Sequence, residues 1–131
     1  MFTGIRACVF DAYGTLFDFG SAAADCADVL GEKAAPLTAL WRDKQMKYSW
    51  LRGLQGRYVP FWQVTGEALD YAMETRGLQQ DAILRAQLMD LYRTLGTFPE
   101  VPVVLQTLRQ AGFATAILSN GSREMLASAV Q

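Results

Sequence analysis

The sequence predicts an α/β fold: a Rossmann-like parallel-sheet core that is incomplete, with its first two strands, and an inserted all-helical cap. Two continuous apolar runs, residues 5–10 and 113–118, are typical of buried strands. A helical segment directly before the second run completes a βαβ unit, which requires parallel strands. We therefore expect residues 1–15 and 99–131 to form the partial core and residues 16–98 to form the cap.

Helical spacing of apolar residues predicts the remaining elements in order. Ser21 is the candidate N-cap of the first helix, Pro36 fits the first turn of the second, and Gly77 is a natural stop for the third. The apolar stripe of the second helix comprises Leu37, Leu40, Trp41, Tyr48 and Leu51. The expected helices cover residues 21–30, 36–51, 60–76, 81–95 and 100–111, and a last helix begins near Ser122.

Composition and charge exclude several classes of protein. The chain of 131 residues is 51% hydrophobic, so it can bury a core. Its net charge of −1 offers no electrostatic argument for binding nucleic acid or an anionic membrane. No apolar run approaches the roughly 20 residues of a membrane span, and the start of the sequence lacks the pattern of a signal peptide. We therefore expect a cytoplasmic protein without a nucleic-acid or membrane partner.

The cysteine and histidine counts limit the chemistry. Cys8 and Cys26 lie among apolar residues, which favours two small buried side chains over a disulfide or redox pair. The sequence has no His, which excludes Ser-His-Asp and Cys-His catalysis and every zinc site with a His ligand. A nucleophile or general base must then be a carboxylate, a Lys, a Tyr or a Cys.

Polar residues follow both predicted strands, at the point where each strand ends. Asp11 follows the first strand, and Ser119 and Asn120 follow the second. Parallel strands bring such loops to one edge of the sheet, where ligands bind in open α/β folds. Asp11 is therefore the candidate nucleophile, with the alternative that it is an ordinary turn residue.

The residues beside the candidate nucleophile also have two interpretations each. The backbone N–H groups of the turn that contains Ala12 and Tyr13 are suited to holding a substrate anion. Thr15 either hydrogen-bonds the carboxylate or its loop, or acts as an ordinary N-cap. The loop after the second strand offers a hydroxyl and an amide to an anion, or forms a plain Asn-Gly turn.

Two pairs of motifs resemble a known family. Residues 10–16 (FDAYGTL) and 118–121 (LSNG) resemble the haloacid dehalogenase superfamily. Residues 40–52 (LWRDKQMKYSWLR) and 58–62 (YVPFW) resemble the cap of its L-2-haloacid dehalogenase (type II) branch. The resemblance covers residues 6–131 and implies hydrolysis of short L-2-haloacids to 2-hydroxy acids, with halide as the other product. It implies no metal and no cofactor, and it suggests a homodimer.

The resemblance implies a mechanism with an ester intermediate. Asp11 attacks the halogen-bearing carbon, and water then attacks the Asp11 carbonyl and releases the 2-hydroxy acid with inverted configuration. Arg42 and Asn120 cradle the departing halide. The alternative for Arg42 is a solvated side chain at the border of an apolar helix face.

The resemblance also implies the contacts to the rest of the substrate. Ser119 and the backbone N–H groups of Ala12 and Tyr13 hold the substrate carboxylate. Met46 and Phe61 wall the halogen pocket, although apolar residues at helical spacing are also ordinary core residues.

Tyr13 separates two enzymatic interpretations of the first motif. Phosphatases similar to this superfamily carry a second Asp two residues after the nucleophile, which protonates the leaving alkoxide and accompanies a magnesium ion. A halide is the anion of a strong acid and leaves without a proton. Tyr13 at this position therefore favours carbon–halogen cleavage over phosphate ester hydrolysis.

The resemblance further implies a longer protein. Members of the family continue well beyond Gln131, with further strands, a Lys that pairs with the nucleophile and an acidic motif that positions water. Without that Lys, Asp11 lacks its main charged partner. We therefore expect a fragment or a truncated form. The alternatives are a sheet completed by a partner or a second copy, and a catalytically dead remnant.

Overall fold

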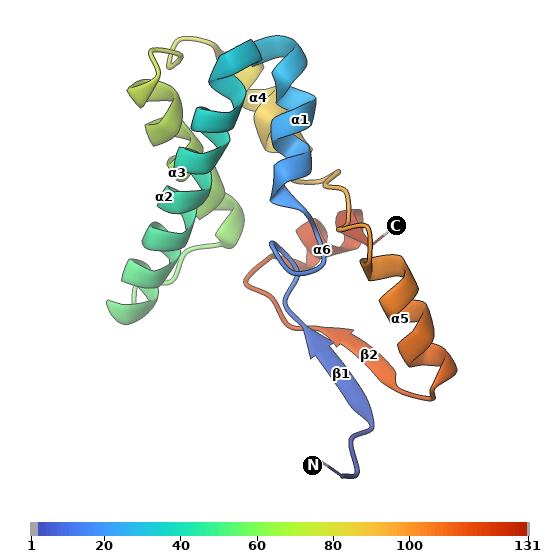
Figure 1. Cartoon of the computed structure of the whole chain (residues 1–131). Coiled ribbons are helices and arrows are strands. Elements are labelled where there is room, and N and C mark those ends of the chain that lie inside the picture. Colours follow the sequence, from blue (N-terminus) through green and yellow to red (C-terminus); the bar gives the residue numbers. More distant parts are fainter. Residues whose placement is uncertain (1–2, 131) are drawn as a thin grey trace.

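The computed structural model describes residues 3–130, apart from the side chains of residues 22–24 and 129. The elements in chain order are β1 (Ala7–Phe10), α1 (Phe19–Leu30), the 3₁₀ helix η1 (Gly31–Lys33), α2 (Ala34–Leu54), α3 (Phe61–Thr75), α4 (Ala82–Leu91), α5 (Val101–Gln110), β2 (Ala114–Ile117) and α6 (Arg123–Ala129). The sheet of β1 and β2 lies at one end of the molecule, and α1 to α4 form a helical group at the other end (Figure 1).

The two strands pair in parallel, as the βαβ pattern predicts. Ala7 lies opposite Ala114 and Phe10 lies opposite Ile117, and α5 forms the crossover between the strands. The ladder extends one step further, because the Leu118 N–H donates to the Phe10 carbonyl at 2.8 Å. The polar loops that follow the two strands therefore leave the sheet side by side.

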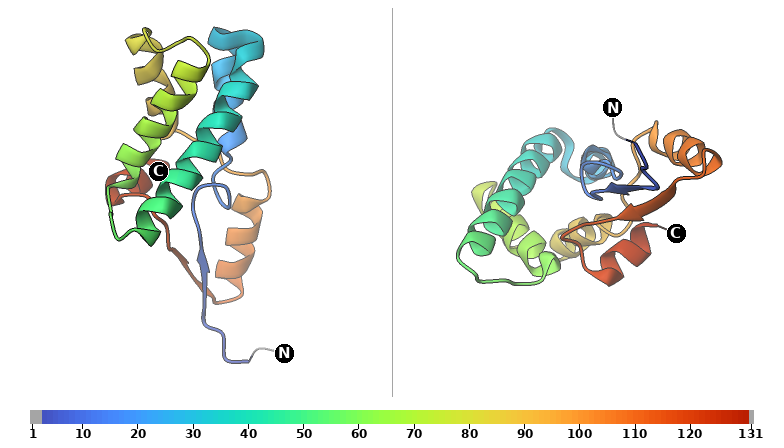
Figure 2. Two further views of the ribbon diagram at one scale, coloured as in Figure 1. Left: turned by 90° about the vertical axis from the view of Figure 1, so that its left-hand side faces the viewer. Right: turned by 90° about the horizontal axis from the view of Figure 1, so that it is seen from below.

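The strands are shorter and more exposed than the apolar runs predict. Each has four residues, and exposed residues alternate with half-buried ones along both. Val9 is 59% exposed, and Leu118, just after β2, is 75% exposed. The prediction of buried strands is therefore wrong for the described residues. The physical reason is that α5 packs along β2, while a sheet of only two strands leaves its outer edges open (Figures 1 and 2).

Helices α2 and α3 make the most extensive contact within the helical group, and α1 packs against α2 (Figure 2). Helix α2 begins at Ala34, before the predicted start at Pro36, because proline is tolerated in a first turn. Helix α2 also continues past Gly53 and ends at Leu54, beyond the predicted end at Leu51. The predicted stripe residue Leu51 is 54% exposed, since the last turns of α2 pass beyond the buried cluster. Helix α4 ends at Leu91, four residues before the predicted end.

The two connections between the sheet and the helical group lie side by side. The Asp18 N–H donates to the Gly96 carbonyl at 2.8 Å, and the Phe98 N–H donates to the Leu16 carbonyl at 3.1 Å. Ser21, the predicted N-cap of the first helix, instead supports this junction, since its hydroxyl oxygen accepts from the Gly96 N–H at 3.2 Å. The N-cap is Asp18, whose carboxylate accepts a backbone N–H of the first turn at 2.7 Å.

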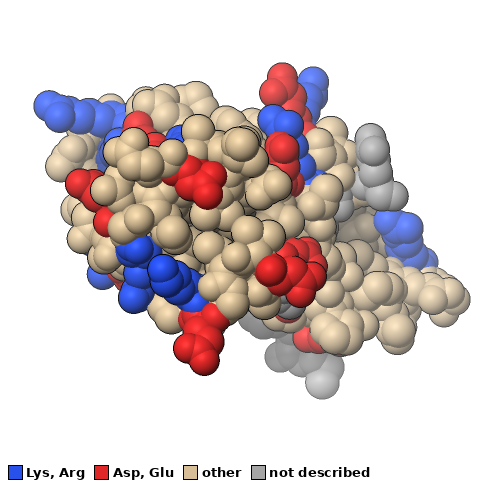
Figure 3. All heavy atoms as spheres, turned by 90° about the horizontal axis from the view of Figure 1, so that it is seen from above, with Lys and Arg blue, Asp and Glu red and all other residues tan. Residues whose placement is uncertain are grey.

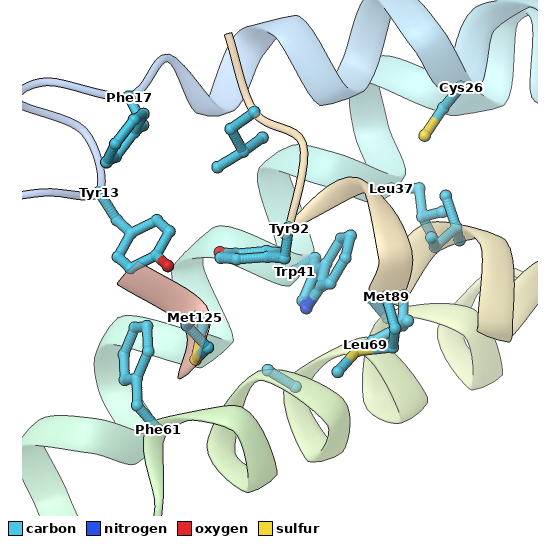
Figure 4. Close-up of a cluster of buried hydrophobic side chains, with 14 of the residues drawn as sticks. Tyr13, Phe17, Cys26, Leu37, Trp41, Phe61, Leu69, Met89, Tyr92 and Met125 are labelled. Carbon is cyan, nitrogen blue, oxygen red and sulfur yellow. The ribbon is translucent and has the colours of Figure 1, made fainter. Parts of the chain in front are cut away.

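One cluster of buried side chains joins the helical group to the carboxyl end of the sheet (Figure 4). Trp41 from α2 and Tyr92, just after α4, are fully buried, with ring centroids 5.1 Å apart. Tyr13, from the loop after β1, has its ring centroid 5.6 Å from that of Tyr92. Met125 from α6 is buried in the same cluster. The division into a cap over 16–98 and a partial core stays a prediction, since this cluster runs through both parts.

The two cysteines are free thiols, as predicted, although they differ in burial. Cys26 is buried, whereas Cys8 is half-buried. Burial, with Asp25 as a smaller cause, raises the pKa of the Cys26 thiol to about 11. Cys26 therefore stays protonated and unreactive near neutral pH.

The surface over the helical end carries interspersed acidic and basic side chains (Figure 3). Lys47 pairs with Asp43 one turn earlier in α2, and Arg85 pairs with Asp70 across α4 and α3. Exposed pairs of this kind contribute little to stability, so the buried cluster carries most of it. No helix among residues 3–130 combines the length and apolarity that crossing a membrane requires.

We predict that Trp41→Phe lowers the free energy of unfolding by about 1–3 kcal/mol, because the buried Thr65 carbonyl loses the indole N–H that donates to it at 2.8 Å. Urea denaturation followed by far-UV circular dichroism measures the change. Trp50→Phe is the matched control, since Trp50 is 71% exposed and its loss should stay below about 0.5 kcal/mol. Equal losses in the two variants would contradict the role assigned to the indole hydrogen bond.

Candidate active site

The Asp11 loop is fixed by its own backbone. The Leu16 N–H donates to the Ala12 carbonyl at 2.9 Å, and the Gly14 N–H donates to the Phe17 carbonyl at 2.9 Å. Gly14 has φ +91°, a conformation that favours glycine and closes the turn. Asp11 itself is exposed at the end of β1. Among the described residues, the Ala12 N–H donates no hydrogen bond, and Ala12 is fully buried.

Arg42 reaches this loop from α2. Its Nη2 donates to the Tyr13 carbonyl at 2.9 Å, and its Nη1 donates to Gln45 Oε1 at 2.8 Å. A Cβ atom on Gly14 would lie 3.0 Å from Arg42 Nη2, so the glycine also leaves room for the guanidinium. The face of the Phe19 ring lies 5.8 Å from the guanidinium carbon. The structure therefore brings Arg42 and the Asp11 loop together, and the halide-binding role of Arg42 stays a prediction.

The loop after β2 borders a large cavity. Ser119 and Asn120 line a space of about 830 Å³ together with Phe61 of α3 and the last turns of α2. The Ser119 hydroxyl oxygen accepts the Gly121 N–H at 3.1 Å, which leaves the hydroxyl proton free to donate. Asn120 is exposed and makes no hydrogen bond with its side chain among the described residues. The second loop thus presents a hydroxyl and an amide to a cavity that Phe61 helps to wall.

The other predicted site residues are not among the lining residues of this cavity, and these include Asp11, Ala12, Tyr13 and Arg42. Met46 is 42% exposed and is not among the cavity's lining residues. Thr15 lines a separate hollow of about 160 Å³ beside α5, together with Glu100 and Val101. Thr15 is not the N-cap of the first helix, because Asp18 has that role. A hydrogen bond between Thr15 and the Asp11 carboxylate stays a prediction.

Tyr13 points into the buried cluster (Figure 4). Its ring packs against those of Phe17, Phe61 and Tyr92, with centroid distances of 6.0, 5.9 and 5.6 Å. Burial raises the pKa of its phenol, so the hydroxyl stays protonated. A Cβ atom on Gly121 would lie only 2.8 Å from Tyr13 Cε2, so the two loops touch through this ring. The position two residues after Asp11 is therefore used for packing.

Sequence reasoning missed Gln45 and Tyr92 as parts of the site. The Gln45 side chain is fully buried, and its oxygen accepts from both Arg42 and Tyr92. One signal was available, because Gln45 falls four residues after Trp41 on the apolar side of a helix, where a polar side chain needs a partner. Gly121 carried no such signal, since an Asn-Gly pair is an ordinary turn.

The acidic residues of the described part do not gather into a metal site. No group of three or more Asp, Glu or Cys side chains within residues 3–130 is placed to share a metal ion. The chemistry available at the sheet edge consists of the Asp11 carboxylate, the Arg42 guanidinium, backbone N–H groups, a hydroxyl and an amide.

We predict that Gly121→Ala lowers the free energy of unfolding by about 1–3 kcal/mol, because the new methyl group meets the Tyr13 ring. Gly53→Ala is the matched control. Gly53 lies inside α2 with open space around its Cβ position, so alanine there should raise stability by about 0.5–1 kcal/mol. Thermal and urea denaturation of both variants provide the measurement. Similar stability of the two variants would contradict the close contact between the loops.

Comparison with known proteins identifies the family of the chain. Residues 5–131 match the family model of haloacid dehalogenase-like hydrolases. The chain is 50% identical over 127 residues to (S)-2-haloacid dehalogenase 1 of Pseudomonas sp. (strain CBS-3), with 97% of this chain and 56% of the relative covered. It is 46% identical over 131 residues to (S)-2-haloacid dehalogenase 4A of Burkholderia cepacia, with 100% and 57% covered.

A solved structure shows the same fold with a ligand. The L-2-haloacid dehalogenase of Xanthobacter autotrophicus, with chloropropionic acid covalently bound, superimposes with a TM-score of 0.87 at 43% identity, over 97% of this chain and 51% of that one. The chain therefore spans little more than half the length of the relatives it matches. The predicted resemblance and the predicted α/β fold class are confirmed. The chain belongs to the haloacid dehalogenase-like hydrolase family.

Proposed function

We propose that this chain carries the nucleophile and the halide site of an enzyme that hydrolyses short L-2-haloacids to 2-hydroxy acids. The observation that carries the proposal is the Arg42 guanidinium, which hydrogen-bonds the carbonyl of Tyr13 in the loop of Asp11. This hydrogen bond brings a cation to the loop that begins at Asp11, the only carboxylate that directly follows either described strand. The relatives named above, which are 2-haloacid dehalogenases, supply the substrate class.

In the first step, an Asp11 carboxylate oxygen attacks the halogen-bearing carbon from the side opposite the halogen. A carbon–oxygen bond forms, the carbon–halogen bond breaks, and the halide leaves with the bonding electron pair. The exposed position of Asp11 at a strand end gives the carboxylate access to substrate. A covalent adduct is consistent with the relative from X. autotrophicus, in which chloropropionic acid is covalently bound.

Arg42 and Asn120 hold the departing halide in this proposal. Two of the five guanidinium N–H donors are used by Tyr13 and Gln45, and others remain for an anion. A fixed cation stabilises charge that develops on the leaving group at no further cost of reorganisation. The Tyr13 side chain is buried in the aromatic cluster and is no substitute for the second carboxylate of a phosphatase, which supports halide over alkoxide as the leaving group.

The Ser119 hydroxyl and the N–H groups of Ala12 and Tyr13 hold the substrate carboxylate. The Ser119 oxygen already accepts the Gly121 N–H, so its proton is directed to another acceptor. Adjacent backbone N–H groups in a tight turn form a concave anion site. A carboxylate there would place the neighbouring α-carbon close to Asp11.

In the second step, water attacks the carbonyl carbon of the ester, and the hydroxy acid leaves with its configuration inverted at the carbon that bore the halogen. The step restores the carboxylate and releases one proton. The sequence has no His to accept that proton. Of its three lysines, Lys44 lies over the Tyr71 ring and Lys47 pairs with Asp43. The Lys that the resemblance implies would belong to the part of the relatives that this chain does not span.

We predict that Asp11→Asn abolishes chloride release from L-2-chloropropionate, because an amide does not form the ester. The measurement is chloride released by the purified 131-residue chain. Asp28→Asn is the matched control, since Asp28 is an exposed acid on α1 and its replacement should change nothing. Chloride release by the Asp11→Asn variant would rule out Asp11 as nucleophile. An unmodified chain that binds the acid without releasing chloride would favour the inactive remnant instead.

We further predict that Arg42→Lys slows halide release by about 100- to 1,000-fold, because one ammonium group does not contact the Tyr13 carbonyl, Gln45 and a halide with a guanidinium's geometry. The expected loss is in kcat, measured at saturating substrate. Arg57→Lys, at an exposed position after α2, is the control. An unchanged kcat in the Arg42 variant would show that the guanidinium is a structural tether only.

A further inference from the structure

Gln45 is a fully buried amide at the centre of a hydrogen-bonded chain. Its Oε1 accepts from Arg42 Nη1 at 2.8 Å and from the Tyr92 hydroxyl at 2.8 Å. Its Nε2 donates to Thr65 Oγ1 at 2.8 Å, and the Thr65 hydroxyl donates to the Phe61 carbonyl at 2.8 Å. The chain thus runs from α3 through α2 to the Asp11 loop, because Arg42 continues it to the Tyr13 carbonyl.

The order of donors fixes which way the Gln45 amide points. The Thr65 proton is committed to a backbone carbonyl, so the Thr65 oxygen must accept, and only the Gln45 NH₂ group can donate to it. The oxygen of Gln45 is then turned toward Arg42 and Tyr92. Burial raises the pKa of Tyr92, so its hydroxyl stays protonated and remains a donor. In each of these hydrogen bonds, the donor and the acceptor are therefore determined.

Arg42 is consequently held at two points by neutral oxygen atoms. One is the Gln45 side chain and the other is the Tyr13 backbone carbonyl. Within the described residues, the ion pairs of arginine involve Arg52, Arg85 and Arg93, and none involves Arg42. A carboxylate at either point would fix the guanidinium equally well but would neutralise it. Neutral acceptors fix its position and leave its charge for an external anion.

We infer that Gln45, supported by Tyr92, is a positioning residue that aims the Arg42 guanidinium at the Asp11 loop and preserves its positive charge. The identity of the anion as a halide rests on the proposed function. The positioning itself does not, because it follows from the five hydrogen bonds that connect Phe61, Thr65, Gln45, Tyr92, Arg42 and Tyr13.

Nuclear magnetic resonance of the arginine guanidinium groups in the purified chain tests the positioning. We expect slow rotation of the Arg42 guanidinium, with separate Nη signals, because both ends are hydrogen-bonded. Gln45→Met keeps the shape but removes the acceptor, and it should average these signals. The matched control is Thr38→Val, another buried polar position on α2, whose hydroxyl bonds only the carbonyls of Ala34 and Ala35. Its Arg42 signals should stay unchanged.

Separate Arg42 Nη signals in the Gln45→Met variant would overturn the inference, whether or not the chain hydrolyses haloacids. Tyr92→Phe serves if that variant does not fold. It removes one donor from the Gln45 oxygen and should increase the rotation rate of Arg42 without abolishing its hydrogen bonds. An unchanged rotation rate in Tyr92→Phe would contradict the support assigned to Tyr92.

Bromide binding, measured by the broadening of the bromide resonance, distinguishes the effect of the Arg42 position from the effect of its charge. Gln45→Glu should keep Arg42 rotating slowly, because a carboxylate also accepts its hydrogen bond, yet it should weaken bromide binding at least about tenfold. Gln45→Met should weaken it through loss of position. Full bromide affinity in Gln45→Glu would contradict the need for a neutral anchor. An ordered Arg42 in a chain that binds no bromide would instead count against the proposed function and leave the positioning inference supported.

Discussion

The hydrogen bond from Arg42 to the Tyr13 carbonyl is the contact on which the candidate site depends. Through this hydrogen bond, α2 contacts the loop that begins at Asp11. Because the acceptor is a backbone atom, the contact fixes the path of the loop and not only one side chain. Gly14 permits the approach, since any side chain there would meet the guanidinium. The position of α2 and the shape of the loop are therefore determined together.

Tyr13 links the two halves of the structure with two different parts of itself. Its carbonyl receives Arg42, and its ring enters the aromatic cluster with Phe61 and Tyr92. The same ring rests against the backbone of Gly121, which holds the second loop beside the first. A short polar residue at this position would keep the carbonyl that Arg42 contacts but would lose both contacts of the ring. Tyrosine at position 13 thus packs the helices onto the sheet edge. Because tyrosine occupies this position, the second acid of the phosphatase motif is absent.

Much of this arrangement follows from the sequence, because it depends on local patterns. The parallel pairing follows from the order of the elements, and the convergence of Asp11 with Ser119 and Asn120 follows from that pairing. Other features depend on contacts between distant residues. Asp18 is the N-cap, whereas the Ser21 hydroxyl donates to the Asp18 carbonyl and accepts the N–H of Gly96, a partner 75 residues away.

The burial of the strands and the partners of buried polar groups could not be predicted from the sequence, for the same reason. Apolar composition makes a strand suited to burial, but Val9 is covered only if other elements lie over it, and in the described residues they do not. Helical spacing predicts that Gln45 faces inward, yet it does not name Tyr92, which lies 47 residues away, as a donor to it. Sequence patterns of this kind specify which face is buried and leave open what it meets.

The paired connections around Asp18 and Gly96 have a consequence for how such a protein can change. The chain enters and leaves the helical group at one place, where the two segments are hydrogen-bonded to each other. The helical segment between these two connections therefore behaves topologically like a short loop, since its ends stay together whatever lies between them. A different set of helices grafted onto the same two ends would leave the strand register and the Asp11 turn in place. Such a graft would exchange the α2 and α3 side chains that wall the cavity and would keep Asp11, the proposed nucleophile, at the end of β1.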